Sequence, residues 1–245
     1  AVVDMAGNAY AGIGDATTYN FTTGAGSGPT ISGASLLSGG NAFAKAADVV
    51  TLTFTALPVN VAINTPVVVF QSGGSAVENR LGNGSGITYA HLGSNQWTAV
   101  YTAHANDADG EISYNLTAAT QGTSNSSTFT GDGVTFDDIA PTLSNVTIRS
   151  NNSTSTSMAT NLNEVTLSYS SNETLSAAPT VVFTSGGDPV VNRLGNGSQI
   201  AYTDDGSDNY TAKYVADAND TAGAVGYTIT FTDSAGNSGV AVTGP

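Results

Sequence analysis

Cysteine is absent from the 245 residues of this chain. Without a thiol the protein can form no disulfide framework, no thiolate zinc site and no cysteine nucleophile. Histidine is scarce as well, because His91 and His104 are the two imidazoles of the whole chain. The sequence also holds no Gly-x-Ser-x-Gly segment of the kind that presents a nucleophilic serine. These absences predict a protein without catalytic activity.

Basic residues are few. Five Lys and Arg stand against nineteen Asp and Glu, which gives a net charge of −14, and the five basic residues are scattered along the chain. Because phosphate binding requires clustered Lys and Arg, nucleic acid is not an expected partner. The same imbalance disfavours docking on an anionic membrane. No run of about 18 apolar residues is present, so membrane insertion is not expected either.

The chain does contain short segments in which apolar and polar residues alternate. Val50–Thr55, Trp97–Tyr101 and Tyr227–Thr232 are examples, and a period of two is typical of half-buried strands. Clusters rich in Gly, Asn and Ser, such as Ser72–Gly74 and Gly82–Gly84, separate these segments and favour turns. The pattern predicts an all-β protein made of antiparallel sandwiches.

The sequence repeats itself at a spacing of about 113 residues. Asn79–Ser85, with the sequence Asn-Arg-Leu-Gly-Asn-Gly-Ser, returns unchanged as Asn192–Ser198, and Val68–Gly74 returns in similar form as Val181–Gly187. A long repeat of this kind indicates duplicated structural units. We therefore expect two sandwiches, residues 29–138 and 139–245, preceded by an N-terminal extension at residues 1–28.

Two segments carry a family resemblance. Gly133–Ile148 resembles the junction between tandem bacterial Ig-like repeats, and Phe231–Asn237 resembles the Asp-x-Ala-Gly-Asn segment that precedes the last strand of those repeats. The resemblance implies two tandem Ig-like antiparallel β-sandwiches in an extracellular protein, such as a surface filament or the stalk of a large adhesin. It also implies calcium at the junction, where Asp137 and Asp138 lie.

The ends of the chain do not match this family pattern. The first repeat is expected to close with a strand at Gly133–Asp137, after a Ser/Thr/Gly-rich loop, whereas the second has only Ser238–Pro245 after its Ala-Gly-Asn turn. The second sandwich is therefore predicted to lack its last strand. The N-terminus carries a surplus, because Val3–Tyr10 repeats the Asp-x-Ala-Gly-Asn pattern and Asp15–Thr23 has the alternation of a closing strand.

Two interpretations of these ends remain open. In the first, the chain, which begins at Ala1 without Met, is a window from a stalk or spacer of a large Ig-repeat adhesin. In the second, an extended segment at residues 17–23 of one copy completes the open edge of the second sandwich in the next copy. Repeating such a heterologous contact builds a head-to-tail filament. The donor strand would use the residues Thr17, Tyr19, Phe21 and Thr23.

The preferred function is thus a non-catalytic structural subunit of an extracellular filament, with copies of itself as partners. A surface glycan or another cell-surface target would be a further partner. A carbohydrate-binding module is a third class of function, supported by fold analogy and by the single tryptophan, Trp97.

Two groups of acidic residues are candidates for calcium. Asp107, Asp109 and Glu111 offer alternate oxygen ligands around Gly110, as calcium loops do. The junction pair Asp137 and Asp138 is the second group. The alternative for both groups is a solvated turn in an acidic protein.

Asn-x-Ser/Thr sequences are frequent and are candidate glycosylation sites in an exported protein. The alternative is a β-sheet surface rich in Thr, Ser and Asn. The candidate acceptors are Asn20, Asn83, Asn115, Asn125, Asn145, Asn151, Asn152, Asn172, Asn196, Asn209 and Asn219.

Overall fold

The computed structural model describes residues 28–58, 62–78, 86–120, 124–129, 133–191 and 201–245. The N-terminal extension, including the candidate donor strand 17–23, lies outside the described residues. So do Asn20, Asn83 and Asn196 and the whole of both copies of the repeated Asn-Arg-Leu-Gly-Asn-Gly-Ser segment.

The described part of the chain forms two tandem Ig-like β-sandwiches without an α-helix. In the first sandwich, domain 1, one sheet has the order β1-β3-β7-β6 and the other the order β2-β10-β8-β4-β5, with β9 also along β8. The bounds are β1 Thr30–Ser38, β2 Phe43–Ala44, β3 Val49–Leu57, β4 Val67–Ser72, β5 Ser75–Ala76, β6 Thr88–Gly93, β7 Gln96–Thr102, β8 Gly110–Ala119, β9 Ser124–Phe129 and β10 Thr135–Phe136.

The second sandwich, domain 2, repeats this plan. Its sheets have the orders β11-β12-β16-β15 and β14-β13-β17-β18. The bounds are β11 Leu143–Ser150, β12 Glu164–Ser171, β13 Thr180–Ser185, β14 Asp188–Pro189, β15 Ala201–Asp204, β16 Asn209–Val215, β17 Val225–Thr230 and β18 Val242–Gly244.

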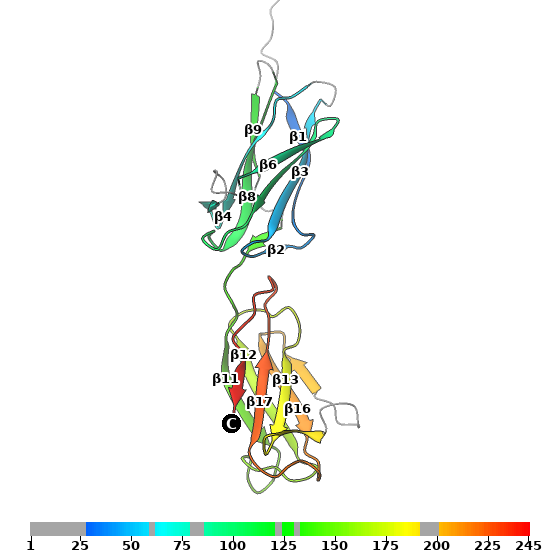
Figure 1. Cartoon of the computed structure of the whole chain (residues 1–245), viewed down its shortest axis with the longest axis vertical. Helices are drawn as coiled ribbons and strands as arrows, with labels where there is room; N and C mark the ends of the chain where they lie inside the picture. The colour runs from blue at the N-terminus through cyan, green and yellow to red at the C-terminus, as the bar shows by residue number, and fades with distance from the viewer. Residues whose placement is uncertain (1–27, 59–61, 79–85, 121–123, 130–132, 192–200) are drawn as a thin grey trace, which may run out of the picture.

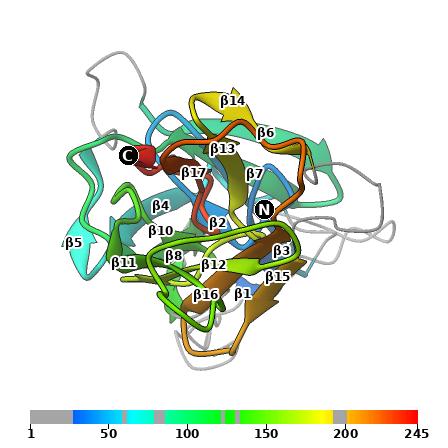
Figure 2. The same cartoon turned by 90° about the horizontal axis from the view of Figure 1, so that it is seen from below.

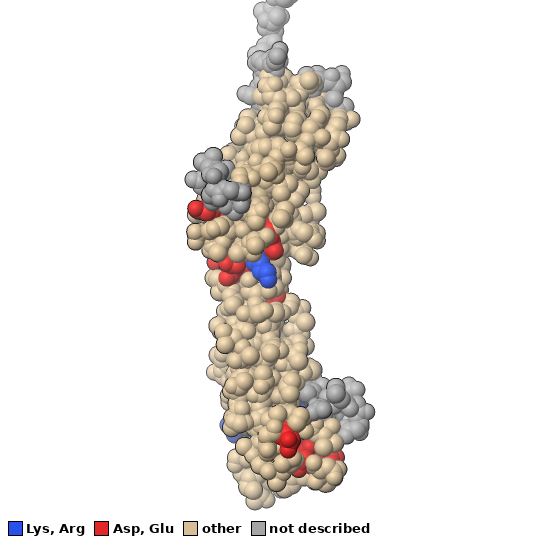
Figure 3. Space-filling model, viewed as in Figure 1, with Lys and Arg blue, Asp and Glu red and all other residues tan. Residues whose placement is uncertain are grey.

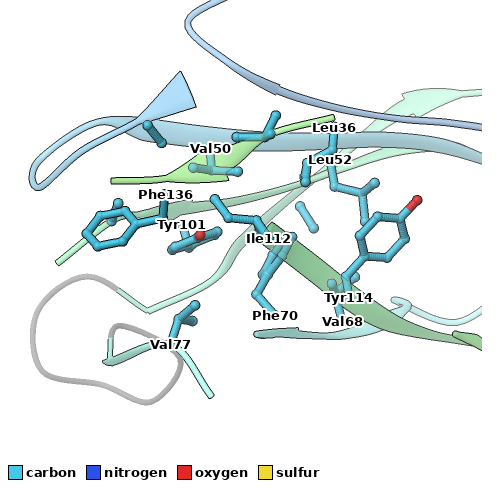
Figure 4. Close-up of a cluster of buried hydrophobic side chains, with 14 of the residues drawn as sticks. Leu36, Val50, Leu52, Val68, Phe70, Val77, Tyr101, Ile112, Tyr114 and Phe136 are labelled. Carbon is cyan, nitrogen blue, oxygen red and sulfur yellow. The ribbon is translucent and has the colours of Figure 1, made fainter. Parts of the chain in front are cut away.

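Each sandwich encloses its own hydrophobic core. The alternation read from the sequence is the cause, because every second residue of a strand faces inward; in β3 buried and half-buried residues alternate over nearly its whole length. The two cores are also alike in detail. The rings of Phe70 and Tyr101 are 4.7 Å apart in domain 1, and those of Phe183 and Tyr214 are 4.8 Å apart in domain 2. Figure 4 shows the domain 1 cluster.

The two sandwiches lie end to end, so the molecule is elongated (Figure 1). β1 begins at the end of domain 1 that faces away from domain 2, and a short connection after β10 leads from the other end into β11. Seen along the long axis, domain 2 lies over domain 1 (Figure 2).

Each domain contains a strand near its end that the sequence analysis did not predict. In domain 1, the segment expected to be a loop contains β9, which pairs with β8 from Tyr114↔Phe129 to Ala119↔Ser124. In domain 2, β18 pairs with β17 in the same way, with Tyr227 opposite Gly244. β18 is thus the counterpart of β9 and not of the strand expected at Gly133–Asp137, which contains β10. What has no counterpart among the described residues is β10.

Candidate functional site

Strand β10 closes the core of domain 1 at the end nearest the junction. Phe136 is 0% exposed and Val134 is 1% exposed, and both belong to the domain 1 core. Phe136 points into the cluster that contains Tyr101 and Ile112 (Figure 4). This short strand and the residue just before it therefore supply two side chains to the domain 1 core.

The backbone of this strand is held on both sides. On one side β10 pairs antiparallel with β8, and on the other it pairs parallel with β2. The amide of Thr135 donates to the carbonyl oxygen of Ala42 at 2.9 Å, and the amide of Asp137 donates to that of Ala44 at 2.8 Å. The carbonyl oxygen of Val134 accepts from the amide of Ile112 at 2.9 Å. β10 thus occupies a slot between β8 and β2.

Domain 2 retains both walls of this slot. One wall is β17, the counterpart of β8. The other, the counterpart of β2, is identified by an equivalent hydrogen bond in the two domains: the amide of Ala47 donates to the carbonyl oxygen of Ala103 at 2.9 Å, and the amide of Leu162 donates to that of Ala216 at 2.8 Å. Both donors have a positive φ, 74° for Ala47 and 70° for Leu162. This correspondence places Met158–Ala159 where β2 lies in domain 1.

A groove lies between these walls. It has a volume of about 720 Å³ and is lined by residues of β11, β12, β13, β16 and β17, by the segments that follow β11 and precede β17, and by Pro245. Its apolar lining includes Val165, Tyr214 and Val225. These three residues are the counterparts of Val50, Tyr101 and Ile112, which belong to the core cluster that Phe136 completes in domain 1. The strand register shows the correspondence. In domain 1 the paired residues are Ser38↔Val50↔Tyr101 and Ser72↔Ile112, and in domain 2 they are Ser150↔Val165↔Tyr214 and Ser185↔Val225.

The walls of the groove offer unpaired backbone groups and apolar surface. On its groove side β17 pairs with β18 only from Tyr227 onward, so Val225 has no strand partner there among the described residues. Within the same part of the chain no donor bonds to the carbonyl oxygens of Ser157 and Ala159, the counterparts of Ala42 and Ala44. Met158 is 63% exposed. We call this site, bounded by Val225 and Met158–Ala159, the acceptor groove.

The junction between the two domains is a second candidate site. The side-chain amide of Asn237 donates to the carbonyl oxygen of Asp137 at 2.8 Å, and the ammonium of Lys45 donates to that of Gly236 at 2.6 Å. Asp138 is bonded within domain 1, since its amide donates to Asp109 at 2.9 Å and its carboxylate accepts from Ala46 at 3.1 Å. Acidic side chains and a basic one lie at this level of the molecular surface (Figure 3).

Three carboxylates converge at this junction. Oxygens of Asp137, Glu173 and Asp233 lie within 4.8 Å of one another, and Asp233 is 1% exposed. Burial, followed by the charges of Asp137 and Asp233, raises the pKa of Glu173 above its ordinary value. Carboxylate oxygens are the ligands that calcium prefers. This donor set fits a hard divalent cation, which would offset the repulsion among the three charges.

The predicted calcium loop does not come together as a three-carboxylate cluster within the described residues. Asp107 is buried, and its carboxylate accepts from the amides of Glu78 at 2.6 Å and His104 at 3.0 Å. Asp220 does the same in domain 2 with Val191 and Asp217. The repeated Asn-Asp pair is therefore explained by the closing of a turn. Asp109 binds the amide of Asp138, and Glu111 is exposed on β8.

Sequence reasoning placed Asp137 at the junction but missed Glu173 and Asp233. These two lie about 60 residues apart in the sequence, in the loops after β12 and β17. A signal was present for Asp233, which opens the Asp-x-Ala-Gly-Asn segment. In the structure its carboxylate accepts from the amide and side chain of Asn237 at 2.8 and 2.9 Å, which explains the spacing of those two residues.

The described glycosylation candidates differ in accessibility. Asn115 is half-buried on β8, Asn125 lies on β9, and Asn152 is half-buried with its side-chain amide donating to Asn163. The exposed candidates are Asn145, Asn151, Asn172, Asn209 and Asn219. Of these, Asn209 and Asn219 donate their side-chain amides to Asp205 and Asp217.

No catalytic arrangement is formed by the two histidines. His91 stacks on Trp97 with ring centroids 4.6 Å apart, and His104 Nδ1 accepts from the amide of Asn106 at 3.1 Å. Because His91 covers the indole, Trp97 is not an open platform for a sugar ring. Lys213, the cation on β16, pairs with Glu164 at 3.0 Å.

No protein-family model and no curated protein sequence matches the chain. Among solved structures, the chain is similar to the crystal structure of a chicken TCR, with 13% sequence identity, 88% of this chain and 97% of that chain covered, and a TM-score of 0.28. Among the described residues, no helix is long and apolar enough to cross a membrane. Function therefore has to be inferred from the acceptor groove and the junction.

Proposed function

We propose that the protein is a non-catalytic structural subunit of an extracellular filament. Each subunit donates the N-terminal strand 17–23 to the acceptor groove of the next subunit, and the subunits assemble head to tail. The observation that carries this proposal is the groove itself, which lies in domain 2 at the position equivalent to that of β10 in the core of domain 1.

The N-terminal segment has the side chains that such a groove requires. Tyr19 and Phe21 are two residues apart, so in an extended strand they point to the same face, as Val134 and Phe136 do in domain 1. Fully burying one such aromatic side chain stabilises a contact by about 1.5–3 kcal/mol. The backbone of the strand would also bond to the open edge of β17.

Geometry favours donation between copies over closure within one copy. Residues 24–28 separate the candidate strand from Pro29 and can span at most about 18 Å when fully extended. β1 begins at the far end of domain 1, whereas the groove lies in domain 2 beyond the junction. The ten residues of β8 alone span about 33 Å. The groove is therefore out of reach of the strand in its own chain.

The junction would give the filament part of its stiffness. Calcium held by Asp137, Glu173 and Asp233 would connect the last strand of domain 1 to two loops of domain 2. The contacts of Asn237 and Lys45 already bridge the same gap. The low content of basic residues and the net charge of −14 would keep neighbouring filaments apart by repulsion.

A chain shortened by residues 1–23 tests the proposal. We expect the full chain to form uniform filaments in electron microscopy, and the shortened chain to stay monomeric with both sandwiches folded by circular dichroism. Adding a synthetic Asp15–Thr23 peptide should raise the melting temperature of the shortened chain, whereas the same peptide with serine in place of Tyr19 and Phe21 should not. Filaments formed by the shortened chain would refute strand donation.

A second measurement addresses the alternative, a stalk segment of a large Ig-repeat adhesin. In a stalk, the strand that fills the groove would come from the same covalent polypeptide. Intact mass of the native material distinguishes the two: separate chains near 24.5 kDa, plus any glycan, support a filament subunit, and one polypeptide many repeats long supports a stalk.

A further inference from the structure

The acceptor groove has two hydrogen-bonding walls, and domain 1 contains a strand bound in the equivalent position. We infer from this that the donated strand lies between β17 and Met158–Ala159, antiparallel to the first and parallel to the second, with Asn20 opposite Ala224 and Met158. This inference rests on the proposed function and adds the binding mode: a partner strand of defined direction and register, recognised on both edges.

The register follows from the position of β10. Thr135 lies opposite Glu111 of β8 and opposite Phe43 of β2. The counterpart of Glu111 is Ala224, since Ile112 and Val225 occupy equivalent positions opposite Ser72 and Ser185. The counterpart of Phe43 is Met158.

Side-chain character then selects which residues of the donor face the groove. Val134 and Phe136 flank Thr135 and are buried, whereas Thr135 is half-buried. In the donor, Tyr19 and Phe21 flank Asn20 in the same pattern. Phe21 therefore takes the place of Phe136, against Tyr214 and Val225, and Tyr19 takes that of Val134. The polar Asn20 faces away from the core.

The second wall distinguishes this site from a plain sheet edge. In domain 1, Ala42 and Ala44 accept from the amides of Thr135 and Asp137 at 2.9 and 2.8 Å. Ser157 and Ala159 hold the equivalent carbonyl groups, and among the described residues they accept no hydrogen bond. A donated strand would satisfy these carbonyls and the amide of Val225 together. It would also cover Met158, which is 63% exposed.

Because the chain has no cysteine, introduced cysteine pairs report this register directly. Three full-length double variants are compared: Asn20→Cys with Ala224→Cys, Asn20→Cys with Met158→Cys, and the control Asn20→Cys with Thr228→Cys, a residue of β17 four positions further along the chain than Ala224. A disulfide needs Cα atoms closer than about 7 Å, and four residues along a strand correspond to about 13 Å. After mild oxidation of filaments, we expect a ladder of covalent multimers for the first two variants and monomers for the control.

Each outcome has a defined meaning. A ladder from the control in place of the first variant would contradict the register. The absence of a ladder from the Met158 variant would contradict pairing of the donated strand with Met158–Ala159. Filaments are first counted under reducing conditions by electron microscopy. If filaments form but neither expected pair cross-links, the binding mode is wrong and strand donation survives. If the unmodified chain forms no filaments and its groove does not bind the Asp15–Thr23 peptide, the proposed function itself fails.

Discussion

The side-chain amide of Asn237 lies 2.8 Å from the carbonyl oxygen of Asp137 and joins the last loop of domain 2 to the end of β10 in domain 1. The same amide bonds to the carboxylate of Asp233, so one side chain both closes its own turn and bridges the domains. This dual role explains why the Asp-x-Ala-Gly-Asn segment has its fixed spacing.

Replacing Asn237 by alanine should loosen the junction. The variant loses the bridge to Asp137 and the side-chain donor to the buried Asp233, while the backbone amide of residue 237 still donates to Asp233. Such losses cost about 1–3 kcal/mol. We expect the melting temperature of domain 2 to fall by roughly 5–15 °C, and small-angle X-ray scattering to record a broader distribution of molecular lengths. Asn219→Ala removes an exposed turn asparagine and serves as the control, with a change below about 2 °C.

Phe21→Ala should weaken assembly without affecting the fold. Truncating a fully buried phenylalanine costs about 3–5 kcal/mol, which corresponds to at least a hundredfold loss of affinity between subunits. The measurement is the critical concentration for filament formation by light scattering. Thr18→Ala lies on the opposite face of the same strand and should leave that concentration within about twofold. Equal effects of the two variants would contradict burial of Phe21.

Phe136→Ala should destabilise domain 1, because β10 is the covalent counterpart of the donated strand. The side chain is 0% exposed, so its loss should cost about 3–5 kcal/mol. The unfolding transition of domain 1 in differential scanning calorimetry should therefore fall by well over 10 °C. Phe43→Ala, on the adjacent and partly exposed β2 position, is the control and should cost less than half as much. The transition of domain 2 should not move in either variant.

Calcium should stabilise the junction through Glu173. At neutral pH in EDTA the three carboxylates repel, and we expect added calcium to raise the melting temperature of the native chain. Glu173→Gln removes one charge, so the variant should melt about 2–5 °C higher than the native chain in EDTA and gain little from calcium. Glu164→Gln, which breaks an exposed ion pair elsewhere in domain 2, is the control and should retain the response to calcium.

The pH dependence in EDTA follows from the raised pKa of Glu173. Because the folded state holds this proton more tightly than the unfolded state, the destabilising repulsion is present above the raised pKa and is relieved as the pH falls towards the ordinary value of 4.5. The difference in melting temperature between Glu173→Gln and the native chain should therefore shrink as the pH is lowered from 7 to about 5. A difference that stays constant over this pH range would show that Glu173 affects stability by something other than its charge.

Much of the fold could be predicted from local pattern. The alternation at Val50–Thr55, Trp97–Tyr101 and Tyr227–Thr232 correctly predicted strands there, since alternation reflects burial of one sheet face. β9 was missed because its Ser-Asn-Ser-Ser-Thr sequence has the composition of a loop and only the neighbouring β8 defines it as a strand.

The sites depend on contacts that composition does not encode. The acceptor groove could be anticipated as an open edge, but its second wall at Met158–Ala159 could not, since that segment is not itself a strand. The acidic cluster joins Asp137, Glu173 and Asp233 from three separate loops, and pairings at such sequence separation arise from topology rather than from spacing.

The location of the acceptor groove in domain 2, with the start of β1 at the far end of domain 1, has a consequence for growth. A filament assembled by the proposed strand donation would be polar, with two chemically different ends: one with an unfilled acceptor groove and the other with an unbound donor segment. A short peptide carrying Tyr19 and Phe21 would cap the first end and leave the second untouched. Polymer length could then be set by the ratio of such a terminator to subunits, and closed rings would require a bend that a straight, end-to-end pair of sandwiches opposes.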